Sequence, residues 1–326
     1  MSNRRREFLA ASLLLPAWLS ACTASRPEER SRRRIVATTP MLGDLAKRIA
    51  PDADNAHLFG EGVDPHLYKP TRSDIVELVR ADVIVTNGLM LEGRMGDAFH
   101  RAAESGRTVV AVGDSLPPDR LLHAEGSHGH PDPHIWMDPS LWSLCGEVLA
   151  HRLGAADDRG RDQYLERAAR FSAHATELEG NALGAIDSVP ADRRILVSAH
   201  DAFGYFGKRF GLEVHAIQGI STESEAGLAD VESLVTFLVE RRVPAVFVES
   251  TVSPRTIQAL IAGAHARGHS VTIGGELFSD SMGPAGTPEG TWPGMLAHNV
   301  STIVTALGGT VPAGGLIPKE FASART

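Results

Sequence analysis

The sequence predicts an α/β protein of two lobes, each a four-stranded parallel sheet with flanking helices, joined by one long rigid helix. Three observations predict this fold. Short apolar runs alternate with helical stretches, the series of strands is interrupted after the fourth, and the interruption has the pattern of a single helix. Near-continuous apolar runs are typical of parallel strands that helices cover on both faces, and strand–helix repeats form βαβ units with right-handed crossovers.

The predicted strands fall into two sets of four. The first set is residues 34–39, 56–60, 83–87 and 108–113, and the second is residues 195–199, 213–217, 245–250 and 270–275. Segments of helical period and length lie between the strands, among them residues 71–80, 230–241 and 254–267. Pro254 near one helix start and Gly268 just past its end fit the usual preferences at helix termini.

The interruption between the two sets predicts the connecting helix. From residue 161 to residue 186, apolar side chains recur at steps of three and four, which places them on one stripe. Such a helix is roughly 39 Å long, and Pro190 limits its end. A coiled-coil arm is the alternative, but there are too few heptads for one. The chain therefore divides into a lobe over residues 34–158, a bridging helix over 159–188 and a lobe over 189–326.

Composition narrows the function classes. The chain has 326 residues, with 43% hydrophobic and 22% charged residues, which is typical of a soluble globular protein. There are 32 basic and 40 acidic residues, and the net charge of −8 disfavours a nucleic-acid binder. Two cysteines cannot form a disulfide scaffold, whereas fourteen histidines are many for this length.

The first 21 residues have the features of a secretion signal. Three arginines precede an apolar stretch over residues 8–19, which is too short to span a membrane as a helix. Leu19-Ser20-Ala21-Cys22 resembles a bacterial lipobox, so we expect Cys22 to carry a lipid and residues 22–33 to form a tether; a buried cysteine after an ordinary signal is the alternative. Arg5-Arg6-Glu7-Phe8-Leu9 resembles a twin-arginine export motif, with ordinary secretion the alternative.

Four potential metal ligands follow strand ends. His66 and His134 come after the second and fourth strands, while His200 and Asp280 follow the first and last strands of the second lobe. Ligands of open α/β sheets bind beyond the carboxyl ends of the strands, so all four side chains can meet in the cleft between the lobes. Three imidazoles and one carboxylate suit a borderline divalent metal such as Zn²⁺ or Mn²⁺.

Nearby residues are candidates for supporting roles. Asp64, Asp201 and Glu249 can accept the distal ring N–H of a ligating histidine, although helix capping and surface solvation are alternatives. His123, His128 and His130 lie with two glycines in a loop before His134. They are candidates for a weaker, auxiliary metal-collecting site, with a solvated flexible loop as the alternative.

Several segments carry a family resemblance, which covers residues 35–307. They are residues 66–70 (His-Leu-Tyr-Lys-Pro), 133–139 (Pro-His-Ile-Trp-Met-Asp-Pro), 200–206 (His-Asp-Ala-Phe-Gly-Tyr-Phe), 219–226, 246–250 and 277–280. In this order they resemble the zinc/manganese solute-binding lipoproteins of ABC importers. The resemblance implies Rossmann-like lobes, a metal bound by His66, His134, His200 and Asp280, and docking on a permease. Members with glutamate at the third position lean towards manganese, so His200 leaves zinc and manganese both open.

The expected function is capture of Zn²⁺ or Mn²⁺ as transported cargo and its delivery to permease subunits that work with a cytoplasmic ATPase. We expect a monomer outside the cytoplasm, periplasmic or at the cell surface, anchored by lipid and binding no nucleic acid. A lipid-anchored adhesin and a periplasmic metallochaperone are alternatives that differ in their partner. A zinc hydrolase is disfavoured because the chain has no His-Glu-x-x-His motif or nucleophile elbow, and a siderophore or corrinoid binder needs a roomier cleft.

Overall fold

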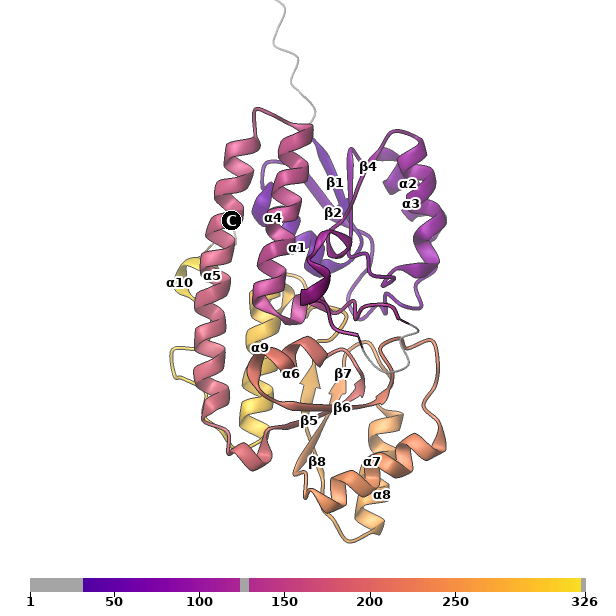
Figure 1. The fold of residues 1–326 in the computed structure, drawn as a ribbon, viewed down its shortest axis with the longest axis vertical. Helices are drawn as coiled ribbons and strands as arrows, with labels where there is room; N and C mark the ends of the chain where they lie inside the picture. The colour runs from indigo at the N-terminus through magenta and orange to yellow at the C-terminus, as the bar shows by residue number, and fades with distance from the viewer. Residues whose placement is uncertain (1–31, 124–128, 324–326) are drawn as a thin grey trace, which may run out of the picture. The chain divides into compact units, whose positions relative to one another are not determined.

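The first lobe of the computed structural model is built on one parallel sheet with the strand order β2-β1-β3-β4 (Figure 1). The strands are β1 (Arg34–Ala37), β2 (Asp54–His57), β3 (Val83–Thr86) and β4 (Thr108–Ala111). All four residues of β3 are buried, as expected for a central strand covered on both faces. β2 lies two to three residues earlier than the predicted strand over 56–60, so Phe59 and Gly60 belong to the loop that leads to His66.

The structure describes residues 32–123 and 129–323. The predictions for the signal segment, Cys22 and His128 lie outside these ranges. Cys145, within them, is buried and forms no disulfide. None of the helices in the described ranges is both long and apolar enough to cross a membrane.

Three helices of the first lobe begin after side chains that cap them. α1 (Pro40–Ile49) and α2 (Arg72–Arg80) start after Thr39 and Thr71, and each threonine accepts a backbone N–H of the first turn. α4 (Pro139–Ala156) starts in the same way after Asp138. α3 (Gly96–Glu104) completes the helices of this lobe. The predicted helix over 71–80 is therefore confirmed, with Thr71 as its cap.

The second lobe pairs its four strands two by two. β5 (Ile195–His200) pairs with β6 (Glu213–Gln218), and β7 (Ala245–Glu249) pairs with β8 (Thr272–Leu277), both in parallel. A single four-stranded sheet was expected, but β5 and β7 lie next to each other without forming a ladder. At the carboxyl end of β5, the Glu249 side chain accepts the backbone N–H groups of Ala199 and His200, at 2.7 and 2.9 Å. It occupies the donors that a neighbouring strand would otherwise use.

The helices of the second lobe are α6 (Gly204–Phe210), α7 (Leu228–Glu240), α8 (Arg255–Ala266), α9 (Trp292–Ala306) and α10 (Lys319–Ser323). Those predicted over 230–241 and 254–267 correspond to α7 and α8. β8 begins two residues later than its prediction, so Glu276 and Leu277 are strand residues rather than loop residues.

The connecting helix is α5 (Arg161–Asp187), 27 residues and about 40 Å long. It packs on α1 and α4 and also on α6 and α9, so one helix runs past elements of both lobes (Figure 1). Its buried side chains lie on the predicted stripe, with Phe171 and Leu178 among them. A continuous helix with one buried face resists bending because many packed contacts must change together.

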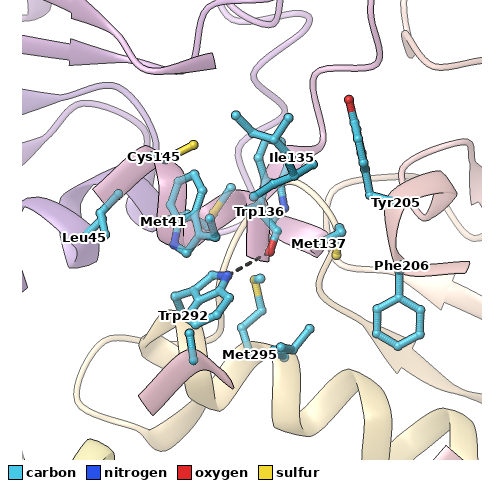
Figure 2. Packing of buried hydrophobic residues seen from close by; sticks show 14 of the residues in the cluster. Met41, Leu45, Ile135, Trp136, Met137, Cys145, Tyr205, Phe206, Trp292 and Met295 are labelled. Atoms are coloured by element: carbon cyan, nitrogen blue, oxygen red, sulfur yellow. Dashed lines mark hydrogen bonds between the residues drawn. The ribbon is translucent and has the colours of Figure 1, made fainter. Parts of the chain in front are cut away.

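A second connection runs through the core between the lobes, and the sequence did not predict it. Trp292, the first residue of α9, packs beside Trp142 of α4 with ring centroids 6.4 Å apart. Its indole N–H donates to the carbonyl oxygen of Trp136 at 2.9 Å (Figure 2). Met41, from α1, and Met295, from α9, belong to the same buried cluster. The start of α9 therefore packs on the first lobe, although the rest of that helix belongs to the second.

Candidate metal centre

Four buried side chains converge at the carboxyl ends of the strands. His66 lies in the loop after β2, His134 immediately precedes the short 3₁₀ helix Ile135–Met137, His200 is the last residue of β5, and Asp280 follows β8. One potential ligand atom from each residue lies within 4.8 Å of all the others. The structure therefore brings together the four side chains that the sequence selected, two from each lobe.

The spacing of these atoms matches a small metal site. Asp280 oxygens lie 3.3 Å from His134 Nε2, 3.2 Å from His200 Nε2 and 3.7 Å from His66 Nε2. The Nε2 atoms of His66 and His134 are 3.3 Å apart. Ligands of a tetrahedral zinc ion with bonds of about 2.0–2.1 Å are separated by about 3.4 Å. The cluster thus has the dimensions of a four-coordinate shell.

Unpartnered polar atoms point to a cation. Both carboxylate oxygens of Asp280 and Nε2 of His200 are buried, and they have no hydrogen-bond partner within the described residues. Buried polar atoms without partners cost free energy, so native proteins seldom retain them without a function. A divalent metal would satisfy all three atoms at once, which makes the donor set fit such an ion.

His200 is held by Glu249. The carboxylate contacts His200 Nδ1 at 2.6 Å and also accepts its backbone N–H, and both side chains are fully buried. A carboxylate on the distal nitrogen fixes the orientation of the ring and leaves Nε2 facing the centre. Glu249 thus occupies the supporting position that the sequence suggested.

His134 is held by Asp132, which the sequence analysis did not select. Asp132 Oδ1 lies 2.7 Å from His134 Nδ1 and accepts the backbone N–H of His134 at 2.9 Å. The sequence contains a signal for this role, because the tripeptide Asp-Pro-His that begins at Asp64 is repeated at Asp132.

The other two supporting candidates do not contact a histidine ring. Asp64 accepts the backbone N–H of His66 at 2.9 Å and the hydroxyl of Thr222 from the second lobe. For Asp201, the described residues show no hydrogen bond to any of the three rings. A further positioning contact comes from Trp136, whose indole N–H donates to the carbonyl oxygen of Ser279 at 2.8 Å. This bond connects the first lobe to the residue before Asp280.

Burial and charge give the three imidazoles different protonation. Burial lowers the pKa of His66 to about 3, and the neighbouring His134 and His200 contribute to this effect. Burial also opposes the charged form of His134, but Asp132 and Asp280 outweigh it and raise its pKa to about 9. Glu249 and Asp280 likewise outweigh burial and raise the pKa of His200 well above its usual value.

The electrostatic balance at Asp280 follows from the same neighbours. Burial alone would raise its pKa, but His200 and His134 hold the pKa of this carboxyl well below its usual range. These shifts favour the ionised form of Asp280, protons on His134 and His200, and a neutral His66 in the metal-free site.

His66 also faces a cavity of about 660 Å³. Leu89, Met90 and Arg94 line one side of it, and Ile220 lines another. His66 retains 7% exposure, whereas His134 and His200 have none. The cavity is the side from which the cluster can be reached.

The histidine loop is only partly described. His123 and His130 are exposed, and His130 lines the cavity near His66. Among the described residues the one cluster with metal-ligand geometry is the buried group of four. The auxiliary site stays a prediction, since His128 lies outside the described ranges.

The protein has two α/β lobes with parallel strands, connected by a long helix, and a cluster of potential metal ligands lies between them. These features define the helix-bridged class of metal-binding proteins. The family described as "ZnuA: Zinc-uptake complex component A periplasmic" matches residues 35–306, and the chain belongs to this family.

Individual relatives agree with this assignment. "Zinc-binding protein TroA" of Treponema pallidum (strain Nichols) is 43% identical over 274 residues, 84% of this chain and 88% of that protein. "Manganese-binding lipoprotein MntA" of Bacillus subtilis (strain 168) is 39% identical over 306 residues, 93% and 99% of the two chains. The solved structure of the periplasmic zinc-binding protein TroA superposes with a TM-score of 0.81 at 42% identity, and covers 85% of this chain and 99% of that one.

Proposed function

We propose that the protein captures a divalent transition metal, Zn²⁺ or Mn²⁺, between its lobes and delivers it to the permease of an ABC importer. The observation that carries this proposal is the buried cluster of three histidines and Asp280, with the separations of a tetrahedral shell and unpartnered oxygens at its centre. The names of relatives include both a zinc-binding and a manganese-binding protein. Both metals therefore stay candidates for this chain.

Four side chains also argue for binding rather than catalysis. A catalytic zinc site keeps one position open for water or substrate. Here Asp280 lies where it would fill the fourth position, 3.2–3.7 Å from the three imidazoles. We infer a cargo site with no catalytic residue.

We further propose where the protein works. Export through the signal of residues 1–21, by the twin-arginine or the ordinary route, and lipid attachment at Cys22 would place it outside the cytoplasm. Residues 22–33 then tether a monomer whose lobes, 34–158 and 189–326, meet along the helix over 159–188. Its partners are the permease subunits and, through them, the cytoplasmic ATPase. A relative named as a manganese-binding lipoprotein supports this arrangement.

The test is a competitive Zn²⁺/Mn²⁺ titration of metal-stripped protein that lacks residues 1–22, with bound metal counted by elemental analysis. We expect one tight equivalent of metal, which His200→Ala abolishes. His100→Ala is the matched control, since His100 is 75% exposed and contacts Glu104 on the surface. Zn²⁺ outcompetes Mn²⁺ at most nitrogen sites, so tight retention of Mn²⁺ is the informative result for cargo.

The outcomes separate the alternatives. No tight equivalent of either metal would overturn the proposal and favour an organic ligand. A tight equivalent combined with permease-independent metal uptake in cells would favour a metallochaperone or an adhesin. A second, weaker zinc equivalent that disappears when His123 and His130 are replaced would support the auxiliary loop site.

A further inference from the structure

The segment that follows β6 crosses to the first lobe without contributing a metal ligand. It lies within residues 219–226, one of the segments that carry the family resemblance. The hydroxyl of Thr222 donates to Asp64 Oδ2. The next residue, Glu223, forms an ion pair with Arg94 at 2.7 Å. Two consecutive side chains of the second lobe therefore contact the first lobe.

The same segment forms one wall of the cavity in front of His66. Gly219, Ile220 and Glu223 line it from the second lobe, opposite the stretch that contains Leu89 and Arg94. The Arg94–Glu223 ion pair joins the two walls. Metal that enters or leaves on the side of His66 passes this segment.

Asp64 connects Thr222 to a metal ligand. Its Oδ1 accepts the backbone N–H of His66 at 2.9 Å, and its Oδ2 accepts the Thr222 hydroxyl. His66 is carried by a loop, whereas His200 ends a strand and has Glu249 on its ring. Asp64 therefore helps to hold the loop that carries His66. His200 needs no such loop contact, because its strand and Glu249 hold it.

The two contacts that this segment makes with the first lobe differ in environment. Arg94 and Glu223 keep 37% and 49% of their side-chain exposure, so solvent screens their attraction and the pair contributes little. The Thr222–Asp64 bond is partly buried, so water competes with it less than with the exposed ion pair. Thr222 is thus the more effective of the two contacts.

We propose that Thr222 is a positioning residue of the metal site: by donating to Asp64 it holds the loop of His66 against the second lobe and sets how long the metal is retained. This inference rests on the proposed function. The contact ties the loop of one metal ligand to the second lobe, whereas Thr222 is not among the described residues that line the cavity. Its loss should therefore speed metal release and leave the rate of metal association through the cavity nearly unchanged.

The experiment measures release and association rates of Zn²⁺ by stopped flow, with an excess of chelator for release, on protein lacking residues 1–22. Thr222→Val keeps the shape of the side chain and removes the hydroxyl. We expect it to raise the release rate about fivefold, the effect of losing one hydrogen bond of ordinary strength, with an unchanged association rate. Thr222→Ser, which restores the donor, should stay within about twofold of the wild type.

Ser224→Ala is the matched control, because Ser224 lies two residues away on the same cavity wall and the described residues show no hydrogen bond from its hydroxyl to the first lobe. An unchanged release rate in Thr222→Val would overturn the inference, as would equal acceleration in Thr222→Ser. If the wild type binds no metal, the proposed function itself fails. If the wild type binds one equivalent and the variants match it in rate, only the role of Thr222 fails.

Discussion

The tripeptide Asp-Pro-His occurs twice in this chain, at Asp64-Pro65-His66 and at Asp132-Pro133-His134, and the two copies share one local geometry. In each, the aspartate Oδ1 accepts the backbone N–H of the histidine at 2.9 Å. Short aspartate side chains favour such turns because they can replace a backbone acceptor. The hydrogen bond within each tripeptide is therefore the same in both copies.

The surroundings then separate the two copies. Asp132 also contacts the ring of its histidine at 2.7 Å, in a site where His134 has no exposure. Asp64 gives its second oxygen to Thr222 instead. As a result, the pKa of His134 rises to about 9, while burial and the neighbouring imidazoles lower the pKa of His66 to about 3. One motif thus supplies a fixed, charged histidine and a neutral one that faces the cavity.

The largest expected effects follow from replacing the histidine of each copy with alanine. Both His134→Ala and His66→Ala should weaken Zn²⁺ binding by several hundredfold, if a free energy of about 10–16 kcal/mol is shared by four ligands. They should differ in the metal-free protein. His134→Ala leaves Asp132 buried without its partner and should cost about 3 kcal/mol of unfolding free energy at pH 7, whereas His66→Ala should cost about 1 kcal/mol.

Urea unfolding of the metal-free variants measures this difference, with His100→Ala as a surface control. The sign is fixed by linkage. A raised pKa means that His134 stabilises the fold fully below an unfolded pKa of about 6.5, and that this contribution is lost as the pH rises through about 9. Equal destabilisation by the two variants at pH 7 would contradict the comparison.

The next largest effect concerns the number of protons that the site releases when Zn²⁺ binds. His134 and His200 have raised pKa values and are protonated at pH 7, whereas His66, with a pKa of about 3, is already neutral. Each protonated ring must lose its Nε2 proton to bind a metal, so Zn²⁺ binding should release about two protons and strengthen about 100-fold per pH unit between about pH 6 and 8.

Calorimetric titration of the metal-free protein in two buffers with different protonation enthalpies measures this release. Asp132→Asn removes the charge that raises the pKa of His134, so proton release should fall towards one per metal in that variant. Release of less than one proton by the wild type would show that the two rings are neutral before metal arrives.

The smallest effect concerns the two aspartates. Asp132→Asn should weaken zinc binding about 10–100-fold, as expected for the loss of a carboxylate that orients a ligating histidine. Asp64→Asn keeps an oxygen for the backbone N–H of His66 and removes no ring partner, so its effect should stay below about tenfold. Competitive zinc titration compares the two variants, and a larger loss in Asp64→Asn would reverse the roles assigned here.

The sequence predicted which four side chains converge because the cause of their convergence is topological. His66, His134, His200 and Asp280 all follow strands of parallel sheets, and the carboxyl ends of such strands meet at one edge. The bridging helix predicted over 159–188 matches α5 to within two residues because its apolar stripe and Pro190 are local signals. These features depend on residues close together in the chain, and the family resemblance over residues 35–307 pointed to the same four ligands.

Contacts between distant segments decided the rest. Local sequence cannot tell Asp64 from Asp132, since both precede Pro-His, and the choice of ring partner depends on what packs around each turn. The second lobe divides into two strand pairs, and the Glu249 side chain reaches from one pair to the backbone of β5 in the other. The packing of Trp292 against Trp142 joins residues 150 positions apart. The sequence by itself determined which groups converge as candidate metal ligands, while only the tertiary structure set their electrostatic environment and how firmly each is held, because burial and ion pairing arise between segments far apart in the chain.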